Sequence, residues 1–197
     1  VNRTMKTAEE WKDSILSETQ IDSENDDDET PIIDQVNIIS LDDSINIKHA
    51  VGTADVICTT TNSTAPLFRG EWVKPGCHIN CIGGYTPFMK EVDGTLVNRC
   101  KVLMDTREAI YVGDLKHLLT SMEEEQEMSL PFGNVSGLLG DLIAGDISMS
   151  GGGGGSSNDI LDCTMFKSVG TAIQDIMTAN EAVKHAKILG IGQEIDM

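Results

Sequence analysis

Cys77-His-Ile-Asn-Cys-Ile-Gly-Gly-Tyr85 and, before it, Ala54-Asp-Val-Ile-Cys-Thr-Thr-Thr-Asn62 are the two stretches that decide the fold of this chain. Each contains a short apolar, β-rich run, over residues 77–82 and 54–59, that leads into glycine or small polar residues. An open α/β sheet binds its ligands where its strands end. The two stretches therefore predict an α/β fold with a ligand site at these strand ends.

Strands and helices alternate through the rest of the chain, which favours βαβ units and a parallel sheet. Hydrophobic spacing predicts helices up to Gln20 and over residues 43–50, 107–119, 135–144 and 165–189. It predicts further strands over residues 36–41 and 101–104. Gly190 is placed to end the last helix.

The chain has 197 residues, which suits one α/β domain with its own core. Its formal charge is −18 and its 14 basic residues are scattered, so we expect no nucleic-acid partner. Seven acidic residues fall within residues 18–29 and four within 123–127, and residues 148–158 include five consecutive glycines. We interpret the acidic runs as solvated surface insertions rather than interaction tails, and the glycine run as a flexible loop.

No run nears the ~20 apolar residues of a membrane helix, and the first residues show no signal-peptide pattern. We therefore expect a soluble, cytoplasmic protein with no membrane partner. Five cysteines, an odd number without CxxC spacing, suit reduced thiols. Cys77 and Cys81 would share one face of a strand opposite His78, so buried thiols are a better interpretation than a metal site.

Four blocks occur along the chain in this order: Ala54-Asp-Val-Ile, Pro75-Gly-Cys-His-Ile-Asn-Cys-Ile-Gly-Gly, Phe166-Lys-Ser-Val-Gly-Thr-Ala-Ile-Gln-Asp175 and Leu189-Gly-Ile-Gly192. Together they resemble the ornithine cyclodeaminase and mu-crystallin family of NAD(P)-binding proteins. The resemblance implies a Rossmann-type cofactor domain and a separate domain for dimerisation and substrate binding. It also implies that this chain holds the later part of such a protein.

The resemblance further implies that the cofactor domain is partial. Nowhere does a GxGxxG follow a strand and open a helix, and the chain begins with Val1. The absent first strand would lie in the middle of the sheet, between strands that this chain supplies, and would leave a hole. We expect a fragment, with a partial cofactor domain over residues 1–160 and a carboxyl-terminal helix and tail over 161–197. A free-standing remnant whose strands close up is the alternative.

The resemblance implies cofactor contacts at three places and at one serine. Asn2, Arg3 and Thr4 would lie beside the adenosine ribose, where Arg3 favours NADP over NAD. Thr60, Thr61 and Asn62 would pass along the nicotinamide ribose, while Gly83 and Gly84 would let the backbone approach the nicotinamide. Ser168 resembles the family's nicotinamide-contacting serine, although it could also cap the last helix. A surface arginine, a threonine-rich turn and ordinary turn glycines are the other interpretations.

Tyr85 stands where the true cyclodeaminases carry a catalytic aspartate, so no catalytic residue is assigned in this chain. A phenol keeps its proton near neutrality and cannot replace a carboxylate base, which puts ornithine cyclisation in doubt. The resemblance instead implies an oxidoreductase that uses NAD(P), with NADP slightly favoured, on an imine or amino-acid C–N bond, with a homodimer as one option. An inactive binding or remnant protein is the second hypothesis, and a cyclodeaminase lyase is the weakest.

Overall fold

The computed structural model of the chain describes residues 5–21, 33, 35–121, 134–148, 161–193 and 195. The chain divides into two compact units, residues 1–53 and 54–197. Asn2, Arg3 and Thr4 lie outside the described residues, as do most of the first acidic run, all of the second and the five glycines. The division expected after residue 160 concerns a return to a dimerisation domain and stays a prediction.

The described residues of the first unit form two helices, α1 (Met5–Ile21) and α2 (Ser44–Thr53). They confirm the helices predicted up to Gln20 and over residues 43–50. Asp43 caps α2, because its Oδ1 accepts a hydrogen bond from the backbone N–H of Asn46 at 3.1 Å. This bond, with a second from the Asn46 side chain, lowers the pKa of Asp43.

The strand predicted over residues 36–41 is wrong. Residues 35–40 have no regular secondary structure, and residues 41–42 form a turn. A strand depends on hydrogen bonds to a neighbouring strand, and none of the described strands pairs with this segment. Its β-rich composition therefore gives no strand in the described structure.

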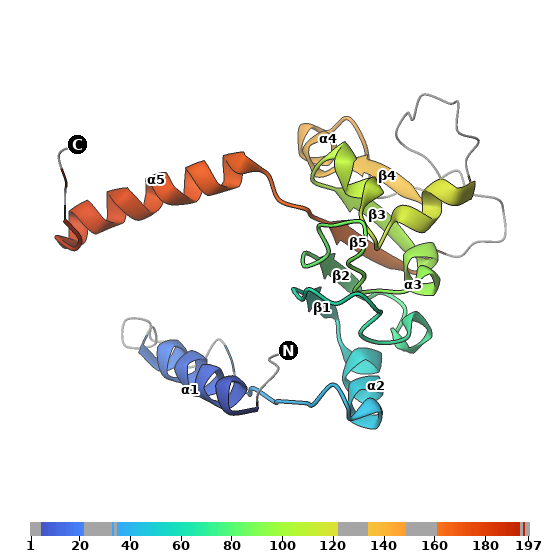
Figure 1. The fold of residues 1–197 in the computed structure, drawn as a ribbon, viewed down its shortest axis with the longest axis horizontal. Helices are drawn as coiled ribbons and strands as arrows, with labels where there is room; N and C mark the ends of the chain where they lie inside the picture. The colour runs from blue at the N-terminus through green and yellow to red at the C-terminus, as the bar shows by residue number, and fades with distance from the viewer. Residues whose placement is uncertain are drawn as a thin grey trace. The chain divides into compact units, whose positions relative to one another are not determined.

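The second unit is built on one five-stranded sheet in which every neighbouring pair is parallel. The strands are β1 (Val56–Thr59), β2 (His78–Cys81), β3 (Cys100–Met104), β4 (Val135–Leu138) and β5 (Cys163–Lys167). Their order across the sheet is β1-β2-β5-β3-β4 (Figure 1). This arrangement confirms the predicted α/β fold with a partial, Rossmann-type parallel sheet.

The described strands pair without a gap, so the hole expected in the middle of the sheet is wrong for this chain. That hole required strands on both sides of the absent one. Residues 36–41 form no strand, and all the other described strands lie on one side of β1. β1 is therefore an edge strand, and β5 occupies the centre of the sheet.

Three helix predictions in the second unit need correction. Residues 165–167, expected to begin the last helix, belong to β5, and residues 135–138 form β4 before the short helix α4 (Leu139–Ala144). Residues 107–119 form two 3-10 helices, η3 (Arg107–Tyr111) and η4 (Lys116–Ser121), in place of one α-helix. Periodicity cannot separate a short buried strand from one turn of a buried helix, which accounts for the first two errors.

An arginine joins three parts of the sheet unit at the amino end of β5. Arg99, the last residue of α3 (Gly94–Arg99), donates from Nε and Nη2 to the two carboxylate oxygens of Asp162, at 3.0 and 2.8 Å. Its Nη1 donates to the carbonyls of Gly70 and Val73 at 2.7 and 2.9 Å. Gly70 begins the short 3-10 helix η2 (Gly70–Trp72). The side-chain bond from Arg99 lowers the pKa of Asp162.

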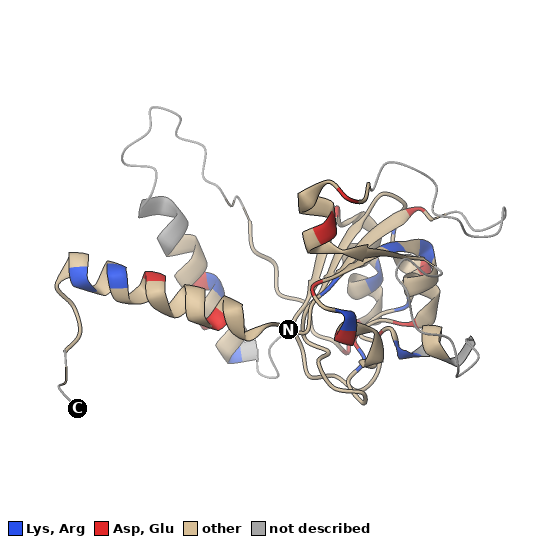
Figure 2. Ribbon diagram, turned by 90° about the horizontal axis from the view of Figure 1, so that it is seen from above, with Lys and Arg blue, Asp and Glu red and all other residues tan. Residues whose placement is uncertain are grey.

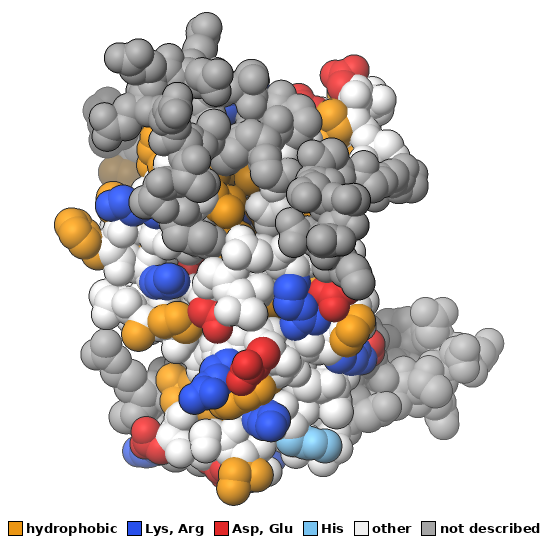
Figure 3. Space-filling model, turned by 90° about the vertical axis from the view of Figure 1, so that its right-hand side faces the viewer, with side chains coloured by type: hydrophobic (Ala, Val, Ile, Leu, Met, Phe, Trp, Pro, Cys, Tyr) orange, Lys and Arg blue, Asp and Glu red, His pale blue; other side chains and the backbone are white. Residues whose placement is uncertain are grey.

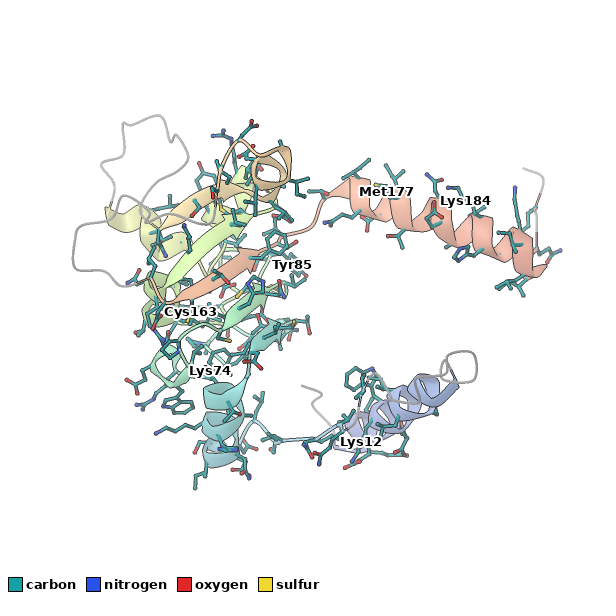
Figure 4. The ribbon with its side chains drawn as sticks, turned by 180° about the vertical axis from the view of Figure 1, so that it is seen from behind. Lys12, Lys74, Tyr85, Cys163, Met177 and Lys184 are labelled. Atoms are coloured by element: carbon teal, nitrogen blue, oxygen red, sulfur yellow. The ribbon has the colours of Figure 1, made fainter. Side chains whose placement is uncertain are left out.

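The last helix, α5 (Ala172–Leu189), begins at a capping box between Thr171 and Gln174. It ends where predicted, because Gly190 adopts a left-handed conformation with φ +65° and donates to the carbonyls of Ala186 and Lys187. None of its residues is buried, and Met177 and Lys184 project from it (Figure 4). Among the described residues, no helix combines the length and apolar composition needed to cross a bilayer.

Basic and acidic residues are interspersed on the helices and around the sheet (Figure 2). On one face of the molecule, lysine and arginine side chains lie beside acidic ones (Figure 3). This arrangement agrees with the scattered basic residues of the sequence.

Candidate functional site

The carboxyl ends of all five described strands lie in one row, the carboxyl edge of the sheet, because every pair of strands is parallel. Residues 60–62 follow β1, residues 82–85 follow β2, and Ser168 follows β5. Tyr85 and Cys163 lie toward opposite ends of the strands in Figure 4, as expected for a residue after one strand and a residue at the start of another. The structure thus brings the predicted residues of these three segments to one edge.

Glu91 connects the segments that follow β1 and β2. Its side chain is fully buried. Oε1 accepts hydrogen bonds from the backbone N–H and the hydroxyl of Thr61, the latter at 2.8 Å. Oε2 accepts from the Thr59 hydroxyl at 2.8 Å and from the backbone N–H groups of Gly83 and Gly84 at 2.9 and 3.2 Å. One buried carboxylate therefore satisfies donors from both segments, as burial of a charge requires.

Gly83 and Gly84 are glycines for a reason within the protein. A β-carbon on Gly83 would come within 2.0 Å of the Thr61 carbonyl oxygen, and one on Gly84 within 2.5 Å of a carboxylate oxygen of Asp114. Both contacts are far shorter than van der Waals separation, so neither position can hold a side chain without moving its neighbours. The glycines let the two segments pack against one another, whatever else they contact.

A buried ion pair lies beside Gly84. Lys167, the last residue of β5, donates from Nζ to Asp114 Oδ2 at 2.8 Å, and both side chains are fully buried. The other oxygen of Asp114 accepts from the backbone N–H groups of Glu91 and Val92, at 2.7 and 3.2 Å. The pair therefore holds the backbone that carries Glu91 and connects it to the central strand.

Ser168 is held by a third carboxylate. Its hydroxyl donates to Asp105 Oδ2 at 2.7 Å, and the same oxygen accepts from the N–H groups of Val169 and Gly170, both at 2.9 Å. Asp105 follows β3, the neighbour of β5. Thr171, not Ser168, caps α5, so the interpretation of Ser168 as a helix cap is wrong.

The side chains at this edge differ in exposure, and exposure decides which of them a ligand can reach. Thr60 and Asn62 are exposed, whereas both donors of Thr61 bind Glu91. The Tyr85 side chain is 60% exposed. Ser168 is buried, and because its proton is donated to Asp105, its oxygen can act toward a ligand only as an acceptor.

Four residues of this network were not predicted from the sequence: Glu91, Asp105, Asp114 and Lys167. One signal could have identified Lys167: this lysine ends a short, mostly apolar run, Thr164-Met-Phe-Lys, and a charged residue in such a run suggests a buried, paired side chain. The three acids lie in irregular segments, and nothing in their local sequence marks them as buried.

The cysteines form no ligand cluster at this edge. All five are free, and four of them are buried, as the interpretation of buried thiols predicted. Burial raises the pKa of the Cys81 thiol to about 12 and that of Cys163 to about 11. The ring of His78 contacts the Thr164 hydroxyl at 2.7 Å. In the part of the chain that the structure describes, no three His, Cys, Asp or Glu side chains are grouped to hold a metal ion.

Comparison with known proteins shows what this chain is similar to. The model of the ornithine cyclodeaminase/mu-crystallin family matches residues 30–187. The chain is 32% identical over 134 residues to the ketimine reductase mu-crystallin of Mus musculus, covering 68% of this chain and 36% of that protein. It is 32% identical over 145 residues to the delta(1)-pyrroline-2-carboxylate reductase of Colwellia psychrerythraea, covering 72% and 41%. The chain spans about two fifths of the length of these relatives.

Solved structures give the same picture. An archaeal alanine dehydrogenase dimer with bound NAD is 29% identical, with a TM-score of 0.55 over 73% of this chain and 41% of that one. Delta(1)-pyrroline-2-carboxylate reductase of Thermococcus litoralis, in complex with NADH and L-proline, is 27% identical, with a TM-score of 0.58 over 75% and 42%. The iminosuccinate reductase of Paracoccus denitrificans, with NAD+, is 27% identical, with a TM-score of 0.59 over 82% and 44%.

Proposed function

Because the chain belongs to the ornithine cyclodeaminase/mu-crystallin family, we propose that this protein, in its complete form, is an NAD(P)-dependent oxidoreductase acting on an imine or amino-acid C–N bond. One observation carries the proposal. The segments after β1, β2 and β5, for which the family implies nicotinamide contacts, meet at one edge of the sheet and are held by the carboxylates of Glu91 and Asp105. Relatives named for imine reduction and amino-acid dehydrogenation support the choice of reaction.

The residues present suit the nicotinamide end of such a cofactor. Thr60 and Asn62 are exposed, and Ser168, although buried, has a hydroxyl oxygen that, among the described residues, accepts only from the Gly170 N–H at 3.2 Å. We propose that this oxygen also accepts from a carboxamide N–H of the cofactor. The cofactor, when bound, supplies the hydride, and the protein orients it against the substrate. The 197 residues contain no GxGxxG turn, so no residue is proposed for the pyrophosphate.

The choice between NAD and NADP follows the relatives rather than Arg3. The three solved relatives hold NAD, NADH and NAD+, and these give no support to the preference for NADP that Arg3 suggested. Arg3 lies outside the described residues. We therefore propose NAD(H) as the cofactor, with an imino or amino acid as the substrate class. A homodimer is part of the proposal, since the archaeal relative is a dimer.

A catalytically inactive binding or remnant protein is the second candidate. The absence of a glycine turn from the sequence favours it. A cyclodeaminase is the third and weakest, because Tyr85 stands at the position where the resemblance implies a catalytic aspartate. No proline should therefore form from ornithine.

Titration tests the proposal directly. The complete polypeptide encoded by the gene, and separately these 197 residues, are titrated with NADH and NADPH by fluorescence, and NADH oxidation is then followed with delta(1)-pyrroline-2-carboxylate. We expect NADH binding and imine-dependent oxidation by the complete polypeptide. Ser168→Ala should weaken NADH binding, whereas Ser44→Ala, an exposed serine in α2, should not. A complete polypeptide that binds neither nucleotide would refute the proposal, and one that binds without turnover would favour the second candidate.

A further inference from the structure

We propose that Glu91 is a positioning residue: its carboxylate takes the place of an anion between the segments after β1 and β2 and holds Gly83, Gly84 and Thr61 in the conformation that receives the cofactor. The inference rests on the proposed function for the identity of the ligand. It rests on the structure alone for the role of Glu91 in holding the two segments.

The geometry is that of an occupied anion site. The backbone N–H groups of Thr61, Gly83 and Gly84 and the hydroxyls of Thr59 and Thr61 all point at one carboxylate. Convergent backbone N–H groups of this kind form concave anion-binding sites in proteins. Here a buried side chain of the chain itself fills the site, so these amides cannot serve a phosphate of the cofactor.

The two oxygens of Glu91 accept hydrogen bonds from different segments. Oε1 serves Thr61, in the segment after β1, whereas Oε2 serves Gly83 and Gly84, in the segment after β2. A neutral amide cannot replace this arrangement, because its NH₂ group would face backbone N–H groups at one of the two positions. Glu91→Gln must therefore leave at least one buried N–H without an acceptor.

The backbone of Glu91 is itself held by hydrogen bonds on both its N–H and its carbonyl. Its backbone N–H donates to Asp114, which is paired with Lys167. Its carbonyl accepts from the backbone N–H of Leu67 at 2.8 Å. Since the backbone of Glu91 is anchored on both sides, the carboxylate is a fixed point from which the two segments are placed.

The test uses Glu91→Ala with acetate, which has the atoms that the substitution removes. Amide hydrogen exchange of Thr61, Gly83 and Gly84 is measured by NMR in the 197-residue chain, and the Kd for NADH is measured by fluorescence in the complete polypeptide. We expect faster exchange at these amides and a Kd raised about tenfold. Acetate should reverse both effects, and acetamide, which has the same shape without the charge, should not.

Glu91→Gln is the second variant, in case Glu91→Ala does not fold, and it should show the same changes without rescue. Glu108→Gln, an exposed glutamate of η3, is the matched control for loss of one negative charge. Wild-type exchange at the three amides in a folded Glu91→Gln variant would overturn the inference, as would equal rescue by acetamide. If the wild-type protein binds no nucleotide, the proposed function fails, and the exchange rates alone then decide the role of Glu91.

Discussion

Replacing Lys167 with methionine should destabilise the sheet unit strongly. The change keeps most of the side-chain volume at the end of β5 and removes the charge that faces Asp114. Both partners are fully buried, so water cannot replace the missing cation. Asp114 would keep only its bonds from the backbone N–H groups of Glu91 and Val92.

The magnitude follows from these contacts. Removal of one partner of a buried ion pair costs about 3–5 kcal/mol. Because two backbone donors remain on Asp114, we expect Lys167→Met to lie near the lower end, about 3 kcal/mol. Asp114→Asn should cost a similar amount, since Lys167 then faces an amide. The double variant buries no charge and should cost about 2 kcal/mol, from imperfect hydrogen bonding alone.

Urea unfolding followed by tryptophan fluorescence measures these free energies. A Trp11→Phe background removes the tryptophan of the first unit, so that Trp72, in the second unit, reports the sheet alone. Lys116→Met is the matched control, because Lys116 is exposed and its loss should change the free energy of unfolding by less than about 0.5 kcal/mol.

The thermodynamic cycle decides whether the pair acts as a unit. If it does, the cost of the double variant falls below the sum of the single costs by at least about 2 kcal/mol. Single variants that each cost less than about 1 kcal/mol would show that the charges are not buried in solution. Strict additivity would show that they do not interact, and either result refutes the reasoning.

Three further predictions concern the packing of glycines, the contacts of Arg99 and the dependence of stability on pH. Gly83→Ala should lower the urea midpoint, because the new β-carbon would lie 2.0 Å from a carbonyl oxygen. The control is Gly140→Ala in α4, where the new β-carbon meets nothing within 4 Å, and it should raise the free energy of unfolding by about 0.5–1 kcal/mol. Equal effects of the two substitutions would contradict this account of Gly83. Arg99→Lys should lower the free energy of unfolding by about 1–3 kcal/mol, because lysine cannot bind both oxygens of Asp162 and two carbonyls together. An unchanged urea midpoint would show that these contacts of Arg99 do not stabilise the unit. Burial raises the pKa of Cys81 to about 12, so the stability that its neutral thiol contributes is complete below the unfolded pKa near 8.5 and is lost as pH rises toward 12. Cys81→Ala should make the fall in unfolding free energy over this range less steep, and an identical slope would show that the thiol is not buried.

The sequence predicts the fold class well and its central strand badly. The apolar runs over residues 54–59 and 77–82 end in small residues and predict strands, and β1 and β2 lie within them. β5 is buried by neighbours on both sides, and its five residues run almost directly into a long helix. A short run with helical sequence following it gives no periodicity of its own, so its position in the sheet comes only from pairing with β2 and β3.

The candidate site divides in the same way. Gly83 and Ser168 can be found from the sequence because they belong to blocks that resemble a family, and Thr60 because it follows the strand that begins in the first block. Glu91 and Asp114 cannot, since their partners are backbone N–H groups 7 to 30 residues away along the chain, and such contacts leave no local pattern. The cofactor contacts implied for the first group remain predictions, whereas the buried contacts of the second are part of the structure.

Together these acids decide what the edge of the sheet can offer a ligand. Glu91 accepts from backbone N–H groups after β1 and β2, and Asp105 accepts from those after β5. Asp114 accepts from the backbone N–H groups of Glu91 and Val92 and so holds Glu91 in place. Phosphate groups are held in proteins by free N–H groups, often at a helix N-terminus, and here such groups are already bonded to carboxylates. The Ser168 hydroxyl donates its proton to Asp105, so its oxygen remains an acceptor. We therefore expect this part of the chain to contact the nicotinamide end of a dinucleotide rather than its phosphates.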